Sequence, residues 1–124
     1  MKKENLILEK SFQFSIHAIE LYKKLADANE YVLSKQFLKS STSIGANVNE
    51  ATAAQSKADF ISKMAIASKE ARETKYWLML LEKSHFISFD FTLLQKEADE
   101  LINILTAIVK TAQSNHSTLK TQNS

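Results

Sequence analysis

Two pairs of histidine and glutamate have the residue types that could act as acids, bases or metal ligands. Glu82 and His85 are spaced like one half of the motif that holds a di-iron centre in helical bundles, but the sequence lacks the second copy that such a centre needs. His17 and Glu20 share a helical spacing, and catalysis would need a nucleophile or a second carboxylate beside them. We expect a surface glutamate and a helix-terminal histidine at the first pair. At the second we expect a surface hydrogen bond or ion pair, and we predict no catalytic residue, metal ligand or cofactor.

The composition excludes several classes of active site. The chain of 124 residues has no cysteine, which excludes a disulfide framework, a thiolate metal site and a cysteine nucleophile. Its single glycine, Gly45, excludes a glycine-rich phosphate loop, so nucleotide hydrolysis is an unattractive interpretation. We predict that the protein is not an enzyme.

Basic residues gather in the middle of the sequence, although the formal net charge is only +2. Such residues could contact the phosphates of a nucleic acid, with Tyr76 or Trp77 available for stacking on bases. The alternative is an ordinary solvated helix face. The candidate nucleic-acid-binding residues are Lys35, Lys39, Lys63, Lys69, Arg72 and Lys75.

A polar stripe at helical spacing runs beside apolar residues and contains Ser40, Ser43, Asn47 and Glu50. Three interpretations are open: a buried hydrogen-bonded network that fixes helix register, an oligomer contact, or a ligand site. Buried polar groups are costly unless they are hydrogen-bonded, so these side chains should have partners wherever they lie. We favour a structural or interface role for Ser43, Asn47 and Glu50.

The elements that position these residues should all be helices, because the chain has no proline and one glycine. Apolar periodicity predicts helices over about 5–28, 34–55, 57–84 and 90–113. With short connections they predict one domain over 1–114, an all-α antiparallel up-down-up-down four-helix bundle. Residues 115–124 have no apolar period and are expected to form a flexible polar tail.

The first predicted helix is apolar over an unusually wide arc. One stripe contains Leu8, Phe12, Ile16, Ile19 and Ala26, and a second stripe beside it contains Phe14, Ala18, Leu21 and Leu25. We expect such a helix to bury more surface than an isolated bundle would cover. In the second helix, small residues around Gly45 should let another helix approach closely.

Helix starts are indicated by capping residues. Ser34 is expected to cap the second helix, and Ser56 with Asp59 matches a variant of the capping box at the start of the third. Ser88 or Asp90 should cap the fourth helix.

A resemblance to a known family rests on the second and third helices. The residues that carry it are Ser43-Ile-Gly-Ala-Asn47-Val-Asn-Glu50-Ala, Asp59-Phe60, Lys63-Met-Ala-Ile-Ala67, Glu70-Ala, and Glu73 through Tyr76-Trp77-Leu78. They closely resemble the bacterial four-helix bundle proteins first noticed as products of intervening sequences within 23S rRNA genes. The outer helices resemble that family only by pattern.

The resemblance implies a homopentamer with no known enzymatic activity. A related family, the accessory variability proteins of diversity-generating retroelements, is a similar pentameric bundle that binds nucleic acid and a reverse transcriptase. By this likeness the expected partners are further copies of the chain, RNA or DNA, and a reverse transcriptase or another protein.

We therefore predict a non-enzymatic, homo-oligomeric scaffold that binds structured RNA or DNA by phosphate contacts through its lysine-rich face. The alternative is a protein–protein adaptor that binds no nucleic acid. We expect a cytoplasmic location and no membrane association, because the sequence shows neither a signal peptide nor an apolar run long enough to span a bilayer.

Overall fold

The computed structural model describes the backbone of residues 3–122 and, within it, the side chains of residues 5–117. In this part of the chain the helices are α1 (Lys3–Asp27), α2 (Leu33–Thr52), α3 (Lys57–Ser84) and α4 (Thr92–Gln122). Each helix packs against the next, and α4 packs back against α1. The predicted all-α, up-down four-helix bundle is confirmed.

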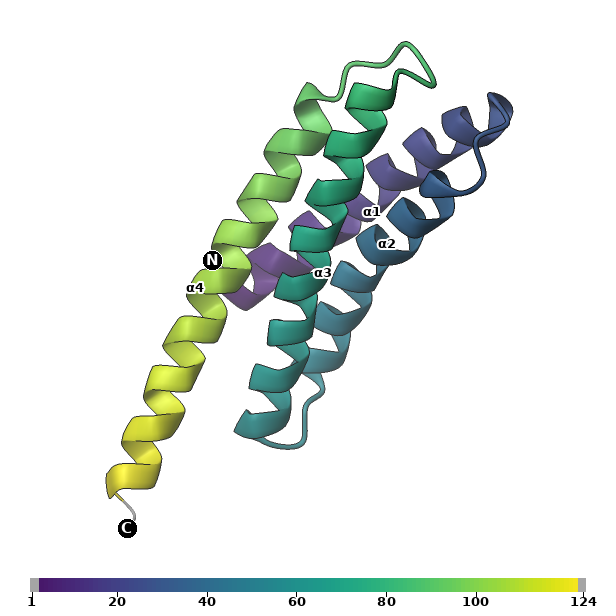
Figure 1. Cartoon of the computed structure of the whole chain (residues 1–124). Coiled ribbons are helices and arrows are strands. Elements are labelled where there is room, and N and C mark those ends of the chain that lie inside the picture. The colour runs from purple at the N-terminus through teal and green to yellow at the C-terminus, as the bar shows by residue number, and fades with distance from the viewer. Residues whose placement is uncertain (1–2, 123–124) are drawn as a thin grey trace.

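The helices alternate in direction (Figure 1). The α1–α2 and α3–α4 connections lie at one end of the bundle, and the α2–α3 turn lies at the other end. The predicted range 57–84 coincides with α3, and α1 and α2 differ from their predicted ranges by a few residues at each end.

The fourth helix is longer than predicted. Its expected end near residue 113 is wrong, because α4 runs to Gln122 and its last part, yellow in Figure 1, extends away from the N-terminal part of α1. Residues 113–122 contain no glycine or proline. Each ordinary residue costs at most about 0.7 kcal/mol of helix propensity relative to alanine, so nothing in this segment stops the helix. The flexibility expected for residues 115–122 stays a prediction, and residues 123–124 lie outside the described part.

The core lies along the axis of the bundle and draws large apolar side chains from all four helices. Fully burying one such side chain stabilises the fold by about 1.5–3 kcal/mol. The largest buried side chains include Phe14, Leu21 and Leu25 from α1, Phe37 and Ile44 from α2, Met64 and Leu78 from α3, and Leu101 and Leu105 from α4.

The two apolar stripes of α1 have different environments. The stripe that contains Phe14 and Ala18 is fully buried in the core. In the other stripe, Phe12 is 60% exposed and Ile16 is 39% exposed. The expected surplus of apolar surface on this helix is therefore present.

The contact between α1 and α2 explains why α1 has this rotation. Gly45 lies on the side of α2 that faces α1, where a Cβ atom would lie 3.6 Å from the Ser11 carbonyl oxygen and from the hydroxyl oxygens of Ser11 and Ser15. This confirms that the small residues around Gly45 admit a neighbouring helix. Because α1 presents Ser11 and Ser15 to α2, Phe12 and Ile16 turn outward.

The helix caps agree with the sequence at α3 but not at α2. The Asp59 N–H donates to the Ser56 hydroxyl at 3.0 Å, as predicted. Ser34 does not cap α2. The carboxylate of Glu30, which is 7% exposed, accepts the backbone N–H groups of residues 32–34 at 2.7–3.2 Å. A carboxylate reaches farther than a serine hydroxyl and can accept several such bonds at the positive end of a helix.

The start of α4 uses one of the two predicted capping residues. A carboxylate oxygen of Asp90 accepts the Thr92 N–H at 3.0 Å. Hydrogen bonds from the Thr92 side chain and backbone lower the pKa of Asp90.

Candidate functional site

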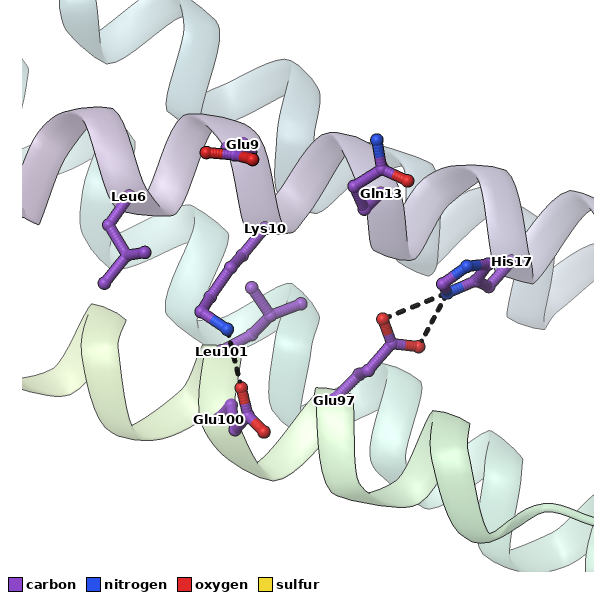
Figure 2. A pocket seen from close by; sticks show the side chains of 8 residues that line it. All are labelled: Leu6, Glu9, Lys10, Gln13, His17, Glu97, Glu100 and Leu101. Carbon is purple, nitrogen blue, oxygen red and sulfur yellow. Dashed lines mark hydrogen bonds and ion pairs between the residues drawn. The ribbon is translucent and has the colours of Figure 1, made fainter.

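A cleft of about 350 Å³ separates α1 from α4 and holds the histidine that the sequence singled out (Figure 2). His17 Nδ1 from α1 lies 2.9 and 3.0 Å from the two carboxylate oxygens of Glu97 from α4. The ion pair or hydrogen bond expected at His17 therefore exists, but its partner is Glu97 and not Glu20. The sequence could not show this partner, because the two residues are joined only by the closure of the bundle.

An ion pair crosses the same cleft. Lys10 Nζ lies 2.8 Å from the Glu100 carboxylate, and each side chain is 39% exposed. The hydrogen bond and the charge of Glu100 raise the pKa of Lys10, and the hydrogen bond from Lys10 lowers the pKa of Glu100. Such exposed pairs contribute about 0–1 kcal/mol each.

The chemistry available in the cleft is limited. The remaining lining residues are Leu6, Glu9, Gln13 and Leu101, so an imidazole–carboxylate pair is present without a hydroxyl or thiol nucleophile. A general base needs a group within hydrogen-bond reach from which to take a proton. The cleft thus holds the Lys10–Glu100 ion pair and the His17–Glu97 contact, which join α1 to α4, and its lining includes no hydroxyl or thiol.

Glu82 and His85 lie at the end of α3. His85 ends the helix in the left-handed conformation, with φ 54°, and both side chains are exposed. Over the described side chains, no group of three or more histidine, cysteine, aspartate or glutamate residues is placed to hold a metal ion.

Half of the candidate nucleic-acid-binding residues are engaged within the chain. Lys63 Nζ lies 3.6 Å from a carboxylate oxygen of Glu50. Lys75 pairs with Asp99 on α4. The Arg72 guanidinium donates to the Thr106 hydroxyl at 3.2 Å. These contacts direct Lys63 toward α2, and Lys75 and Arg72 toward α4, so the six residues do not form one continuous face.

The other three basic residues lie on the outer surface. Within residues 5–117, no ion pair engages Lys35, Lys39 or Lys69. Lys39 from α2 and Lys69 from α3 lie near Glu70. Burial and the charge of Glu73 raise the pKa of Glu70, and these two lysines oppose that shift. The structure therefore brings Lys39 and Lys69 together around one partly buried carboxyl group.

The polar stripe of α2 divides into a buried part and a peripheral part. Ser40 is fully buried, and its hydroxyl oxygen lies 2.9 Å from the Thr74 hydroxyl oxygen of α3. Ser43 donates to the Lys39 carbonyl at 2.7 Å, and Asn47 donates to the Ser43 carbonyl at 2.9 Å. The buried network applies to Ser40, while Ser43 and Asn47 are half-buried and bond within their own helix.

Three apolar patches are exposed on the described surface. The sequence predicted only the apolar surplus on α1. We call the three patches the α1 patch (Phe12, Ile16), the α3 patch (Tyr76, Met79) and the loop-end patch, a name for the exposed apolar side chains of the two connections at one end of the bundle (Tyr31, Val32, Phe86). Tyr76 is 55% exposed and Met79 is 50% exposed. An apolar stripe at helical spacing indicated the excess apolar surface on α1. Tyr76 and Met79 lie among basic residues and form no such stripe.

Comparison with known proteins gives the chain its family. The model of the 23S rRNA-intervening sequence proteins matches residues 3–107. The chain belongs to the 23S rRNA-intervening sequence protein family. The resemblance carried by residues 43–78 is thus confirmed at the level of the family, and the likeness to accessory variability proteins stays a prediction.

A solved structure is similar to this member of the 23S rRNA-intervening sequence protein family along most of its length. It is a protein of unknown function from the S23 ribosomal protein family of Bacteroides thetaiotaomicron, with 44% sequence identity. The match has a TM-score of 0.84 and covers 88% of this chain and 99% of that chain. No curated protein matches the chain. None of the helices, over the residues described, is long and apolar enough to cross a membrane.

Proposed function

We propose that the protein is a non-catalytic helical scaffold that works as a homo-oligomer, with a pentamer as the expected assembly. The observation that carries this proposal is the α1 patch. Phe12 is 60% exposed in the middle of a helix whose neighbouring turns are packed into the core. Exposed apolar patches on a folded bundle mark surfaces that bind another molecule, and a second copy is the partner always present at matching concentration.

The activity proposed for this assembly is the binding of structured RNA or DNA in the cytoplasm. This proposal of nucleic-acid binding is supported by three exposed lysines, Lys35, Lys39 and Lys69. No ion pair engages them within the described side chains. One chain offers few such charges, and a ring repeats them around a shared surface. The lysines would contact phosphates without reading bases, so binding should weaken steeply with salt.

The test is light scattering coupled to size exclusion, with and without a mixed pool of short RNA and DNA, at low and high salt. An oligomer whose mass rises with nucleic acid only at low salt supports both parts of the proposal. A monomer overturns the scaffold. An oligomer whose mass does not change with nucleic acid at either salt concentration overturns the proposed nucleic-acid binding and leaves the scaffold proposal standing. A matched variant, Lys39→Gln with Lys69→Gln, should keep the oligomer and lose most of the mass shift.

A second candidate function is the protein–protein adaptor, and the loop-end patch favours it. Val32 is 75% exposed, and the connection that holds Phe86 lies at the same end of the bundle (Figure 1). A partner protein, such as a reverse transcriptase, would bury these side chains. Substituting Val32→Ser and Phe86→Ser should then abolish capture of the partner without changing the salt-dependent mass shift. Loss of both signals, or of neither, counts against a separate adaptor surface.

A further inference from the structure

We propose that a groove between α3 and α4 binds a phosphate group with two negative charges, as carried by inorganic phosphate or a phosphate monoester. The groove has a volume of about 250 Å³, below the roughly 300–1,000 Å³ of pockets that enclose a drug-sized ligand, so it suits a single charged group. None of Lys35, Lys39 and Lys69 lines it, so the site is separate from the lysines proposed to bind nucleic acid. Its polar lining residues are Ser68 and Arg72 from α3 and Thr106, Lys110 and Gln113 from α4.

The antiparallel packing of α3 and α4 brings these side chains together. The Arg72 guanidinium donates to the Thr106 hydroxyl at 3.2 Å, which indicates the register of the two helices. One turn back along α3 therefore matches one turn forward along α4, and Ser68 lies close to the level of Lys110. The two pairs of residues are about 6 Å apart along the axis, the rise of four helical residues. A ligand between them would be within reach of side chains from both helices.

Several hydrogen-bond donors in the groove have no acceptor among the described side chains. Thr106 accepts from Arg72, and no described hydrogen bond uses its own hydroxyl hydrogen. The Ser68 hydroxyl likewise has no described bond, whereas Ser43 donates to a carbonyl of its own helix. No described ion pair engages Arg72 or Lys110. These donors are available to one acceptor group placed in the groove.

The groove is also positively charged. Arg72 and Lys110 line it, and its lining contains no carboxylate. Residues 101–124 contain two lysines and no aspartate or glutamate, so the whole later part of α4 adds no negative charge. A phosphate in the groove would therefore be in direct contact with two cations and would not be repelled by a carboxylate in the lining.

Carboxylates on the neighbouring turns have contacts elsewhere. Glu70 is close enough to Lys39 of α2 for that lysine to lower its pKa, so it lies toward α2. Glu73 accepts the indole N–H of the chain's one tryptophan at 3.3 Å. Asp99 pairs with Lys75 about two turns of α4, on the order of 10 Å, before the first α4 residue of the groove. The positive charge of the groove is thus left uncompensated by these groups.

A phosphate dianion fits this set of donors and charges. A phosphate monoester carries a charge of about −1.5 to −2 at pH 7 and three acceptor oxygens. The Arg72 guanidinium can donate two parallel bonds to it, and Lys110 supplies a second charge from the other helix. The hydroxyl groups of Ser68 and Thr106 can donate to the remaining oxygen. A carboxylate has two oxygens and one charge, and would leave part of this set unused.

The contact between Arg72 and Thr106 favours binding before the ligand arrives. An exposed arginine loses rotamer freedom when it binds a ligand, and this loss weakens affinity. The Thr106 hydroxyl already holds one N–H of the guanidinium, which leaves the others available. Arg72 is therefore partly oriented at the edge of the groove.

The experiment is a titration of the full chain with inorganic phosphate at constant ionic strength, with chloride as the reference anion. Amide signals in the nuclear magnetic resonance spectrum report the site. We expect saturable shifts confined to about residues 68–72 and 106–113, with a dissociation constant on the order of 1 mM because the groove is open to solvent.

Variants of the two cations test the geometry. Arg72→Gln and Lys110→Gln should each weaken phosphate binding at least about tenfold, because each removes a charge-assisted contact. Arg72→Lys keeps the charge and loses the paired N–H groups, so its affinity should lie between those of the wild type and Arg72→Gln. Lys96→Gln is the matched control, an exposed lysine of α4 outside the groove, and should bind as the wild type does. Arg72 and Lys110 are exposed, so thermal unfolding should show all variants folded.

Three results would overturn the site. The first is the absence of saturable shifts, or shifts spread over lysines on the whole surface. The second is an unchanged affinity in both Arg72→Gln and Lys110→Gln. The third is an equal loss in Lys96→Gln, which would show a general effect of net charge.

Competition with short oligonucleotides distinguishes the sources of the phosphate. Competition only by strands that end in a phosphate supports a terminal phosphate monoester as the occupant, and competition by no strand supports free phosphate. Equal competition by strands that end in a hydroxyl overturns the preference for a dianion, because phosphodiesters would then suffice.

The proposed function and this site fail separately. Lys39→Gln with Lys69→Gln should lose the mass shift with RNA or DNA and keep the binding of inorganic phosphate. A wild type that is a monomer, or that gives no mass shift, would leave the phosphate site standing. Loss of phosphate binding in this double variant would place the bound phosphate outside the groove and would contradict the site.

Discussion

The α2–α3 seam and the α1–α4 seam join neighbouring helices in different ways. Between α2 and α3, the Ser40–Thr74 hydroxyl contact is fully buried among apolar side chains such as Phe37 and Leu78. Between α1 and α4, a cleft of about 350 Å³ is bridged by the Lys10–Glu100 ion pair and the His17–Glu97 contact, whose side chains are partly exposed. One seam excludes water and the other admits it.

This difference shows where stability and adaptability reside in the bundle. Close packing and buried polar contacts cost several kcal/mol to disrupt, whereas exposed ion pairs contribute about 0–1 kcal/mol each. The α2–α3 pair is therefore the rigid half of the molecule. At the α1–α4 seam the polar contacts contribute little, and the two helices are held together by buried side chains such as Phe14 and Leu101. The α1 helix also presents the proposed assembly surface.

The largest expected effect comes from a cavity beside the rigid seam. Leu78→Ala should destabilise the fold by about 2–5 kcal/mol, because Leu78 is fully buried and its neighbours cannot all collapse into the space. Leu93→Ala is the matched control on α4, where the leucine is mostly exposed, and should change stability by less than about 0.5 kcal/mol. Urea unfolding at one protein concentration measures both. Equal losses would show that burial does not distinguish the two positions.

A smaller effect is expected from the buried hydroxyl contact. Thr74→Val keeps the shape of the side chain and removes its hydroxyl, so it should cost about 1–2 kcal/mol. Ser40 keeps a hydrogen bond to the Phe37 carbonyl, which limits the loss. A double-mutant cycle with Ser40→Ala measures the coupling. Strictly additive losses would mean that the two hydroxyl groups do not stabilise each other across the seam.

The sequence predicted the rigid seam better than the open one, for a physical reason. Ser56 and the stripe through Met64 and Leu78 are read from local spacing, because a cap and an amphipathic face depend on residues a few positions apart. The His17–Glu97 pair joins residues from opposite ends of the chain. No local pattern marks such a partner, so it appears only when the bundle closes.

The rotation of α1 shows another limit of periodicity. Both of its apolar stripes repeat at helical spacing, and spacing alone does not say whether Phe12 or Phe14 faces the core. The contact of Ser11 and Ser15 with Gly45 decides it. Likewise the six basic residues share a region of sequence, but cross-helix partners such as Glu50 and Asp99 draw three of them toward α2 or α4 and leave the other three on the outer surface.

The side of α1 that faces α2 provides a third test, with an effect of opposite sign. A Cβ at Gly45 would meet its neighbours at 3.6 Å, an ordinary van der Waals distance. Gly45→Ala should therefore stabilise the fold by up to about 1 kcal/mol through helix propensity. Gly45→Val is the comparison, because its branched side chain would push α1 away and should destabilise. Thermal unfolding measures the change in stability of each variant relative to the wild type. A destabilised Gly45→Ala would show that α1 lies closer to α2 than the structure indicates.

The smallest expected effect is at the open seam and depends on pH. The pKa of Glu100 in the folded protein is lowered from its ordinary value of 4.5, so its stabilisation is present above that pH and is lost as the pH falls through the folded pKa. The pKa of Lys10 is raised from 10.5, so its share is present below that pH and is lost as the pH rises through the folded value. Glu100→Gln should thus cost less than about 1 kcal/mol at neutral pH and nothing in strong acid.

Urea unfolding of the wild type and of Glu100→Gln between neutral and acidic pH measures this difference, and added salt should shrink it. Glu82→Gln is the control, because Glu82 is exposed and its described hydrogen bond is to the neutral Gln95 side chain. A difference for Glu100→Gln that persists in strong acid would come from packing and not from the ion pair. The α1–α4 seam would then resemble the α2–α3 seam, and the contrast between a closed and an open side of the bundle would not hold.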